Sequence, residues 1–280
     1  MTASQLYTLI YSKYGTVTRA RNCFLYTKKG TRLTDLYQEN GRAILGWDGK
    51  NASTFLKNAM NKGLSGNFCV EDKPRINKAV SALIGKECKA AFYNSKLDAV
   101  NAAVKNGAKN IISYRPWNKE PQDTKNADAV IIIPPFPWGE EIYILGISSG
   151  GGASRASATT LGSATPSASA NGVPEALEGP HKLPYTLQSA LTRAIYNLIA
   201  ELDLRTEKDW FIYDPVITKY WERKGPYLFP KISENKYEEF VKHCLECGII
   251  INPDYNEPSI IPFGADKGVF TKLKNNPFEK

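Results

Sequence analysis

Apolar residues recur along this chain with two different periods, and segments of the two kinds alternate. Spacing near 3.6 residues predicts helices over residues 4–14, 51–62, 74–83, 97–105, 184–202 and 234–247. Short alternating or β-branched runs predict strands over 23–26, 32–37, 89–93, 110–113, 129–133, 141–147, 210–213, 227–229 and 249–251. The clearest helix is 184–202, whose stripe is formed by Leu187, Leu191, Ile195, Leu198 and Ile199.

Strands and helices alternate between residues 89 and 147, which is typical of an α/β layer. The run 129–133 is almost continuously β-branched, as expected of a strand buried on both faces. Residues 148–172 are rich in Ser, Ala, Gly and Thr and carry almost no charge, which predicts an irregular loop. The pattern therefore predicts an α/β fold.

The composition, 42% hydrophobic and 23% charged, is that of an ordinary globular protein. No apolar run approaches the roughly 20 residues of a membrane span, and the first residues lack the pattern of a signal peptide. We therefore expect a cytoplasmic protein without a membrane partner. The cysteines are odd in number and irregularly spaced, which argues against a disulfide framework. Cys244 and Cys247, even with His243, supply too few ligands for a structural zinc site, so no metal is expected.

The net charge of +8 is unevenly distributed. Residues 1–110 hold 18 Lys and Arg against 7 Asp and Glu, whereas residues 111–280 hold 18 against 21. A basic half can attract an anionic ligand, nucleic acid or an acidic partner. The candidate contact residues are Lys28, Lys29, Arg32 and Arg42. No nucleic-acid-binding motif accompanies them, so solvated surface charge is the simpler interpretation.

Four segments, taken in order, resemble class III aminotransferases of the PLP-dependent transferase fold. Residues 31–47 resemble a stretch of that family's small domain. Residues 91–100 resemble its Phe-x-Asn-Ser-Gly-Ser-Glu-Ala turn, and residues 112–116 its strand ending in Tyr-His-Gly, with Arg115 at the histidine. Residues 248–262 resemble its C-terminal Gly-Val-Leu-x-x-Pro and Arg-Leu-x-Pro unit.

The resemblance implies positions for a cofactor site. Asn94 and Ser95 would lie at the helix N-terminus that holds the cofactor phosphate in the family. Lys96 stands in place of the family's glycine and would add a positive charge, and Tyr114 would stack on the pyridine ring. Lys182 stands where the family's interface loop approaches the partner subunit's phosphate.

The same comparison shows departures from the family pattern. Ile147, three residues before Gly150, occupies the position of the Schiff-base lysine, and isoleucine cannot form an imine. The strand that carries the aspartate for the ring nitrogen is absent between residues 135 and 141. Ser259 stands where the family has its carboxylate-binding arginine, and Trp47 stands where the family usually has a histidine. Transamination needs both the lysine and the aspartate. Because neither is found at its position in this sequence, the catalytic residues are unknown.

We therefore expect a reduced PLP-dependent transferase fold of the class III aminotransferase type. It would have a shrunken large α/β domain over residues 66–202 and an α+β small domain formed by residues 1–65 and 203–280. The family's arrangement implies a homodimer with a cleft between the domains.

Three functions follow from these features. The first is a degenerate aminotransferase-like protein, not a competent transaminase, that binds a small anionic ligand or acts as a dimeric partner protein. In this case no cofactor is expected. The second is a PLP-dependent transferase that uses a displaced lysine, with Lys182 as the candidate. The third is a basic-surface protein that binds nucleic acid or an acidic partner, and nucleic acid is the weaker expectation.

Overall fold

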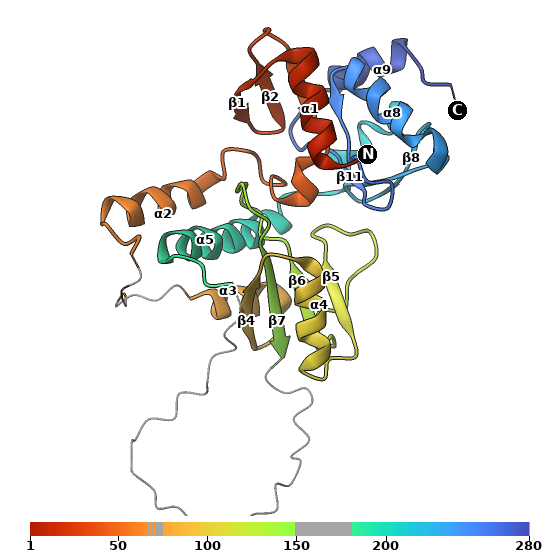
Figure 1. The fold of residues 1–280 in the computed structure, drawn as a ribbon. Helices are drawn as coiled ribbons and strands as arrows, with labels where there is room; N and C mark the ends of the chain where they lie inside the picture. The colour runs from red at the N-terminus through yellow and green to blue at the C-terminus, as the bar shows by residue number, and fades with distance from the viewer. Residues whose placement is uncertain (67, 69, 71–74, 149–180, 280) are drawn as a thin grey trace, which may run out of the picture.

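The computed structural model describes residues 1–66, 68, 70, 75–148 and 181–279. The loop predicted over residues 148–172 lies outside these ranges from residue 149 onward. The described chain forms two lobes, and both termini lie in the upper lobe of Figure 1.

The upper lobe holds two sheets with strand orders β1-β2-β3-β10 and β11-β9-β8. Its elements are α1 (Ala3–Tyr14), β1 (Val17–Arg21), β2 (Phe24–Thr27), β3 (Arg32–Asp35), η1 (Gln38–Gly41), α6 (Glu207–Phe211), α7 (Asp214–Ile217), β8 (Trp221–Lys224), β9 (Tyr227–Pro230), α8 (Glu234–Glu246), β10 (Ile249–Ile250), β11 (Ser259–Ile260), η2 (Lys267–Phe270) and α9 (Thr271–Asn275). Strand β3, from the first part of the chain, pairs in parallel with β10, from its last part, so both parts belong to one sheet. Trp221 and Phe240 are fully buried in the cluster that results.

The lower lobe holds one sheet with the strand order β4-β7-β6-β5. Its elements are α3 (Ile76–Ile84), β4 (Cys88–Tyr93), α4 (Lys96–Lys105), β5 (Ile111–Tyr114), β6 (Ala129–Ile132) and β7 (Tyr143–Ser148). Strands β5 and β6 are parallel, whereas β7 runs antiparallel to both β6 and β4.

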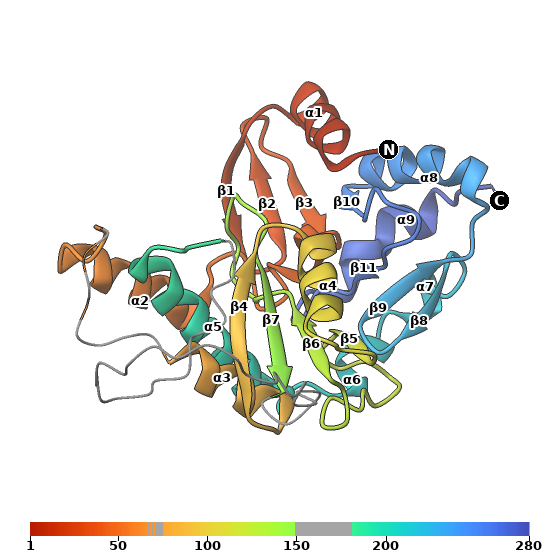
Figure 2. The ribbon, with the colours of Figure 1, turned by 60° about the horizontal axis from the view of Figure 1, so that its bottom comes forward.

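Strand β6 is buried along its whole length, as its β-branched sequence predicted. Side chains alternate between the two faces of a strand. Ala129 and Ile131 therefore pack with the alanines of α4, which crosses one face of the sheet in Figure 2. Val130 and Ile132 pack in a second cluster on the opposite face, with residues of α3 and α5 (Tyr185–Leu202).

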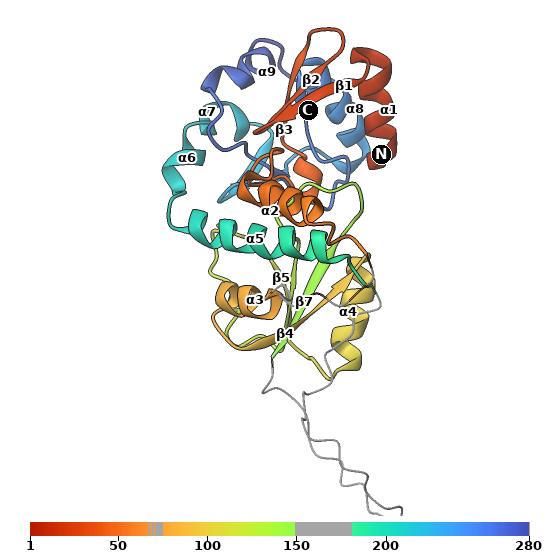
Figure 3. The same ribbon diagram turned by 90° about the vertical axis from the view of Figure 1, so that its left-hand side faces the viewer.

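Helix α5 runs between the lobes, with α2 (Lys50–Asn61) on one side and α3 on the other (Figure 3). Its N-terminal and central turns join the lower cluster through residues that include Leu191 and Ile195. Farther along, Leu198 packs with Tyr227 and Ile260 of the upper lobe. The single helix thus contributes to the cores of both lobes. The domain boundaries expected from the sequence remain a prediction.

Most predicted elements are found in the structure, with ends shifted by one or two residues. The strand predicted at 210–213 is wrong, because these residues belong to α6 and the turn after it. A capping box between Thr206 and Asp209 starts this helix by satisfying two N-terminal backbone donors. The sequence analysis also missed β1, which is mostly exposed, and β8.

Candidate functional site

A cavity of about 80 Å³ lies between the lobes. Its polar wall includes Asn40, Lys96, Ser113, Arg115 and Glu257, and its aromatic wall consists of Tyr114, Tyr143 and Tyr227. Lys96 and Arg115 belong to the lower lobe, whereas Glu257 lies on a loop of the upper lobe. The cavity therefore depends on the docking of the two lobes.

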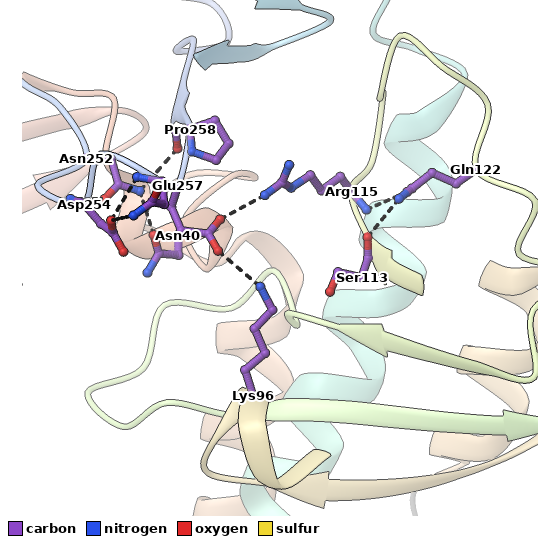
Figure 4. A network of polar contacts seen from close by, with 10 residues as sticks. Asn40, Lys96, Ser113, Arg115, Gln122, Asn252, Asp254, Glu257 and Pro258 are labelled. Carbon is purple, nitrogen blue, oxygen red and sulfur yellow. Dashed lines mark hydrogen bonds and ion pairs between the residues drawn. The ribbon is translucent and has the colours of Figure 1, made fainter. Parts of the chain in front are cut away.

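One carboxylate joins two cations at this cavity (Figure 4). Lys96 Nζ lies 3.2 Å from Glu257 Oε1, and Arg115 Nη2 lies 2.9 Å from Glu257 Oε2. The side chains of Lys96, Arg115 and Glu257 are 42%, 32% and 34% exposed. Each oxygen of the carboxylate thus has its own cationic partner, and water still reaches the group.

The two cations are placed by local hydrogen bonds of the lower lobe. Ser95 caps α4, since its Oγ accepts a hydrogen bond from the backbone N–H of Asp98 at 3.3 Å, and Lys96 is the first residue of the helix. Gln122 fixes the backbone around Arg115: its Oε1 accepts from Arg115 N at 2.7 Å, and its Nε2 donates to Ser113 O at 2.8 Å.

Glu257 is placed by the base of its loop. The Asn252 side-chain amide donates to Asn40 Oδ1 at 2.8 Å and to the Pro258 carbonyl at 3.3 Å. Asn252 N donates to Ser259 Oγ at 2.9 Å, so the hydroxyl of Ser259 is used within the loop. These contacts hold the base of the loop, and Figure 4 shows Glu257 between it and the two cations.

Asn40 reaches the cavity on a strained turn. Gln38, Glu39 and Asn40 have φ values of 45°, 46° and 59°, in the left-handed region that residues with a Cβ rarely adopt. The buried carboxylate of Asp35 holds this turn, because its Oδ1 accepts from Tyr37 N at 2.9 Å and Gln38 N at 3.0 Å. Burial nevertheless dominates and raises the pKa of Asp35 to about 6.

The three tyrosines of the cavity stay neutral near pH 7. Burial raises the pKa of Tyr114 to about 12, and it also raises the pKa of Tyr143 and of Tyr227. Tyr227 donates its hydroxyl hydrogen to the Pro116 carbonyl at 3.0 Å, and Tyr143 donates to Glu141 Oε2 at 3.1 Å. These rings therefore offer flat apolar surface and hydrogen-bonding hydroxyls rather than a base.

The structure brings two of the predicted cofactor residues together. Lys96 and Tyr114 both line the cavity. Ser95 caps the adjacent helix, whereas Asn94 is exposed and does not line the cavity. Lys182 is also exposed and does not line it.

Ile147 lies away from this cavity. It is paired with Lys89 of β4 and Ala129 of β6, and its side chain packs between the sheet and α4. Its assignment to the family's lysine position therefore stays a prediction from the sequence.

Three of the four candidate residues of the basic surface make contacts within the chain. Arg42 donates to the Glu140 carbonyl at 3.0 Å and pairs with Glu39 at 3.3 Å, so it connects the lobes. Lys29 donates to the Lys13 carbonyl, and Arg32 lies over the ring of Phe24. These contacts weaken the interpretation of a cationic surface open to a polyanion.

Within the described ranges, no group of three or more His, Cys, Asp or Glu side chains could hold a metal ion. Nor does any described helix have the length and apolarity to cross a membrane. The described cysteines are free and buried, including Cys244 and Cys247 at the end of α8.

The sequence analysis missed Glu257, Tyr143 and Tyr227 as site residues. Glu257 lies in a polar stretch before Pro258 that has no motif, and the tyrosines lie in ordinary strands. Arg115 was noted only as a departure from the family pattern. Only the packing of the lobes brings these residues to one cavity.

The chain has a relative in sequence and several in structure. No model of a protein family matches the chain. An uncharacterised protein of Treponema pallidum is 27% identical to it over 286 residues, which cover 90% of this chain and 91% of that protein.

Among solved structures, the ornithine δ-aminotransferase of Plasmodium falciparum has a TM-score of 0.61 and 11% identity, covering 98% of this chain and 97% of that one. The acetylornithine aminotransferase of Elizabethkingia anophelis has a TM-score of 0.61 and 12% identity, covering 98% of both chains. The ornithine aminotransferase of Toxoplasma gondii, described with partial occupancy of PLP at its active site, has a TM-score of 0.61 and 9% identity, covering 98% of this chain and 94% of that one. At such identities the likeness shows the fold alone, and it confirms the predicted aminotransferase-like α/β fold.

Proposed function

We propose that this protein uses an aminotransferase-like fold to bind a small anionic ligand in the cleft between its lobes, and that it is not a competent transaminase. The observation that supports this function is the Glu257 carboxylate, which pairs with Lys96 and Arg115 at the cavity. The group that these two cations bind in the structure is therefore a carboxylate.

The ion pairs at the cleft are weak enough to exchange. All three side chains are about a third exposed or more, and exposed pairs typically contribute about 0–1 kcal/mol each. The carboxylate or phosphate of a ligand can therefore replace Glu257 at low cost. A guanidinium offers parallel N–H donors to such a group, and the tyrosine walls suit a flat apolar body.

The residues present do not fit pyridoxal phosphate as they are arranged. The cavity of about 80 Å³ is well below the roughly 300–1,000 Å³ of ligand pockets. Glu257 is the one carboxylate among its described lining residues and is paired with cations, so it is not placed as an acid partner for a ring nitrogen. Ser95 Oγ already accepts from one of the N-terminal amides of α4.

The proposal includes three finer statements from the sequence. The chain is a shortened member of the aminotransferase type in which Ile147 replaces the Schiff-base lysine, it forms a homodimer, and it is cytoplasmic. The resemblance of the four sequence segments supports the first two. The composition, which is that of an ordinary globular protein, supports the third.

Two substitutions test the anion site with benzoate as the probe. Glu257→Gln removes the internal competitor, so we expect benzoate to bind about three to ten times more tightly than to the wild type. Arg115→Met removes a donor and should weaken binding at least about tenfold. Isothermal titration calorimetry measures both, and neutral benzamide should not reproduce the effect.

Glu222→Gln is the matched control, because it removes a carboxylate that pairs with Lys224 on the exposed side of β8. Its affinity for benzoate should equal that of the wild type. Equal affinities for the wild type, Glu257→Gln and Arg115→Met would contradict an anion site at this cleft.

A second candidate function is a PLP-dependent enzyme with a displaced lysine. One observation favours it: Lys96 is the lysine among the described residues that line the cavity. It replaces Lys182 as the residue to test, because Lys182 does not line the cavity.

A titration with pyridoxal phosphate, followed by borohydride reduction and peptide mapping, separates the two functions. We expect no saturable absorbance change and only scattered labelling of surface lysines. A saturable change with Lys96 as the single labelled residue, lost in Lys96→Met, would contradict our proposal and support the second candidate.

A further inference from the structure

A second cavity lies on the outer side of α5, where this helix meets α2 and α3. It measures about 350 Å³, and its lining residues come from the three helices. They are Phe55 of α2, Arg75 and Lys78 at the start of α3, and Ser189, Thr192, Arg193 and Tyr196 of α5. Figure 3 shows the three helices side by side, with α5 between the other two. We call this cavity the helix groove.

Among the described residues, no acidic side chain compensates the charge of the helix groove. Arg75, Lys78 and Arg193 line it, and its described lining residues include no carboxylate. Within the described part of the chain, none of these three cations forms an ion pair. Three cations at one cavity repel one another, so this arrangement does not stabilise the fold. It fits an anionic ligand.

Arg193 provides a second observation. Its Nε is buried and has no hydrogen-bond partner within the described part of the structure. Buried polar groups are nearly always paired, and each exception calls for a physical reason. The guanidinium carbon lies 5.4 Å from the centroid of the Phe55 ring, so a cation–π contact holds this cation beside Phe55 in the groove. The other N–H groups of the guanidinium also make no hydrogen bond within the described part of the structure, and Arg193 lines the groove, so these donors face an anion bound there.

The N-terminus of α3 provides a third observation. Arg75 is the N-cap residue and makes no side-chain capping bond, and the first turn holds no acidic residue. Lys78 stands instead in that first turn, although a helix N-terminus is already the positive end of the helix dipole. Unpaired N–H groups and positive charge at this end are the features that bind phosphate groups.

Two aromatic rings accompany the cations. Phe55 is 43% exposed, and the half-buried Tyr196 also lines the groove. An exposed ring beside a cationic site favours a ligand with a flat ring of its own. The volume of about 350 Å³ matches a ligand of nucleotide size.

We propose that the helix groove binds a phosphate monoester of a planar ring compound, of the size of a mononucleotide. The phosphate lies among Arg193, Lys78 and the N-terminus of α3, and the ring lies against Phe55 and Tyr196. This site is separate from the cleft between the lobes and does not depend on the function proposed for that cleft.

Adenosine 5′-monophosphate is the probe, with adenosine as its uncharged counterpart and isothermal titration calorimetry as the measurement. We expect saturable binding of the monophosphate that weakens as salt rises, and no binding of adenosine. Arg193→Met should weaken binding of the monophosphate at least about tenfold. Lys78→Met, an exposed substitution that leaves the helix packing unchanged, should weaken it about three- to fivefold.

Lys105→Met is the matched control, because this exposed lysine lies on α4, across the sheet from the helix groove. Its affinity should lie within twofold of the wild type. The inference is wrong if adenosine binds as well as its monophosphate, if the monophosphate does not saturate, or if Lys78→Met and Lys105→Met have the same affinity.

Discussion

Replacing Gly225 with alanine is expected to lower the free energy of unfolding by about 3 kcal/mol. Gly225 lies in the turn between β8 and β9 with φ at +59°, and a Cβ there would overlap the carbonyl oxygen of Trp117. Because this neighbour is backbone, it cannot rotate away as a flexible side chain would. The loop that follows Arg115 must shift instead, so benzoate binding at the cleft should weaken in any molecules that stay folded.

Gly264→Ala is the matched control. Gly264 also has a positive φ, +70°, but a Cβ there meets nothing within 4 Å. We expect the backbone cost alone, about 1 kcal/mol. Urea denaturation followed by tryptophan emission measures both variants, since Trp117 packs near Trp210. Equal losses in the two variants would show that the contact between Gly225 and Trp117 is not a constraint.

The pH dependence of stability should contain a large contribution from Asp35. Its pKa is about 6 in the folded protein, against 3.8 for an unperturbed carboxyl. Between pH 4 and 6 the folded state therefore holds more protons on this group than the unfolded state, and the free energy of unfolding falls as the pH rises. The pKa difference corresponds to roughly 3 kcal/mol, lost between pH 4 and pH 7.

Asp35→Asn isolates this contribution from that of other carboxyls. Glu201, for example, has a lowered pKa in the folded state, which makes stability rise with pH. The wild-type free energy of unfolding minus that of Asp35→Asn should fall by roughly 3 kcal/mol from pH 4 to pH 7. Glu120→Gln, on an exposed turn, should leave the wild-type profile unchanged. A constant difference for Asp35→Asn would mean that its hydrogen bonds cancel the effect of burial on its pKa, and a difference that rises with pH would mean that they outweigh it.

The elements that the sequence predicted well are those whose burial repeats with a regular period. Strand β6 and helix α5 have their apolar residues where the core requires them. The segment at Trp210 was predicted as a strand because aromatic residues favour strands. It forms a helix because the capping box at Thr206 stabilises the helix N-terminus. Strand β1 has no apolar alternation, since four of its five residues are exposed.

The candidate site could be predicted only in part. Lys96 and Tyr114 were found because the resemblance to aminotransferases covers the segments that hold them. Glu257 could not be found, because its role comes from a loop of one lobe meeting two cations of the other. The helix groove was invisible for the same reason: Arg75 and Arg193 are 118 positions apart in the chain and meet only when α3 packs on α5.

The charged groups of the cleft come from distant parts of the chain: Lys96 and Glu257 are 161 residues apart. Such a contact forms only after a long loop has closed, so the anion site does not exist until both lobes have folded and docked. A ligand held by Lys96 and Arg115 therefore recognises the assembled protein and no earlier state. Its binding should lengthen the lifetime of the native state by slowing unfolding, while the rate of folding stays nearly the same.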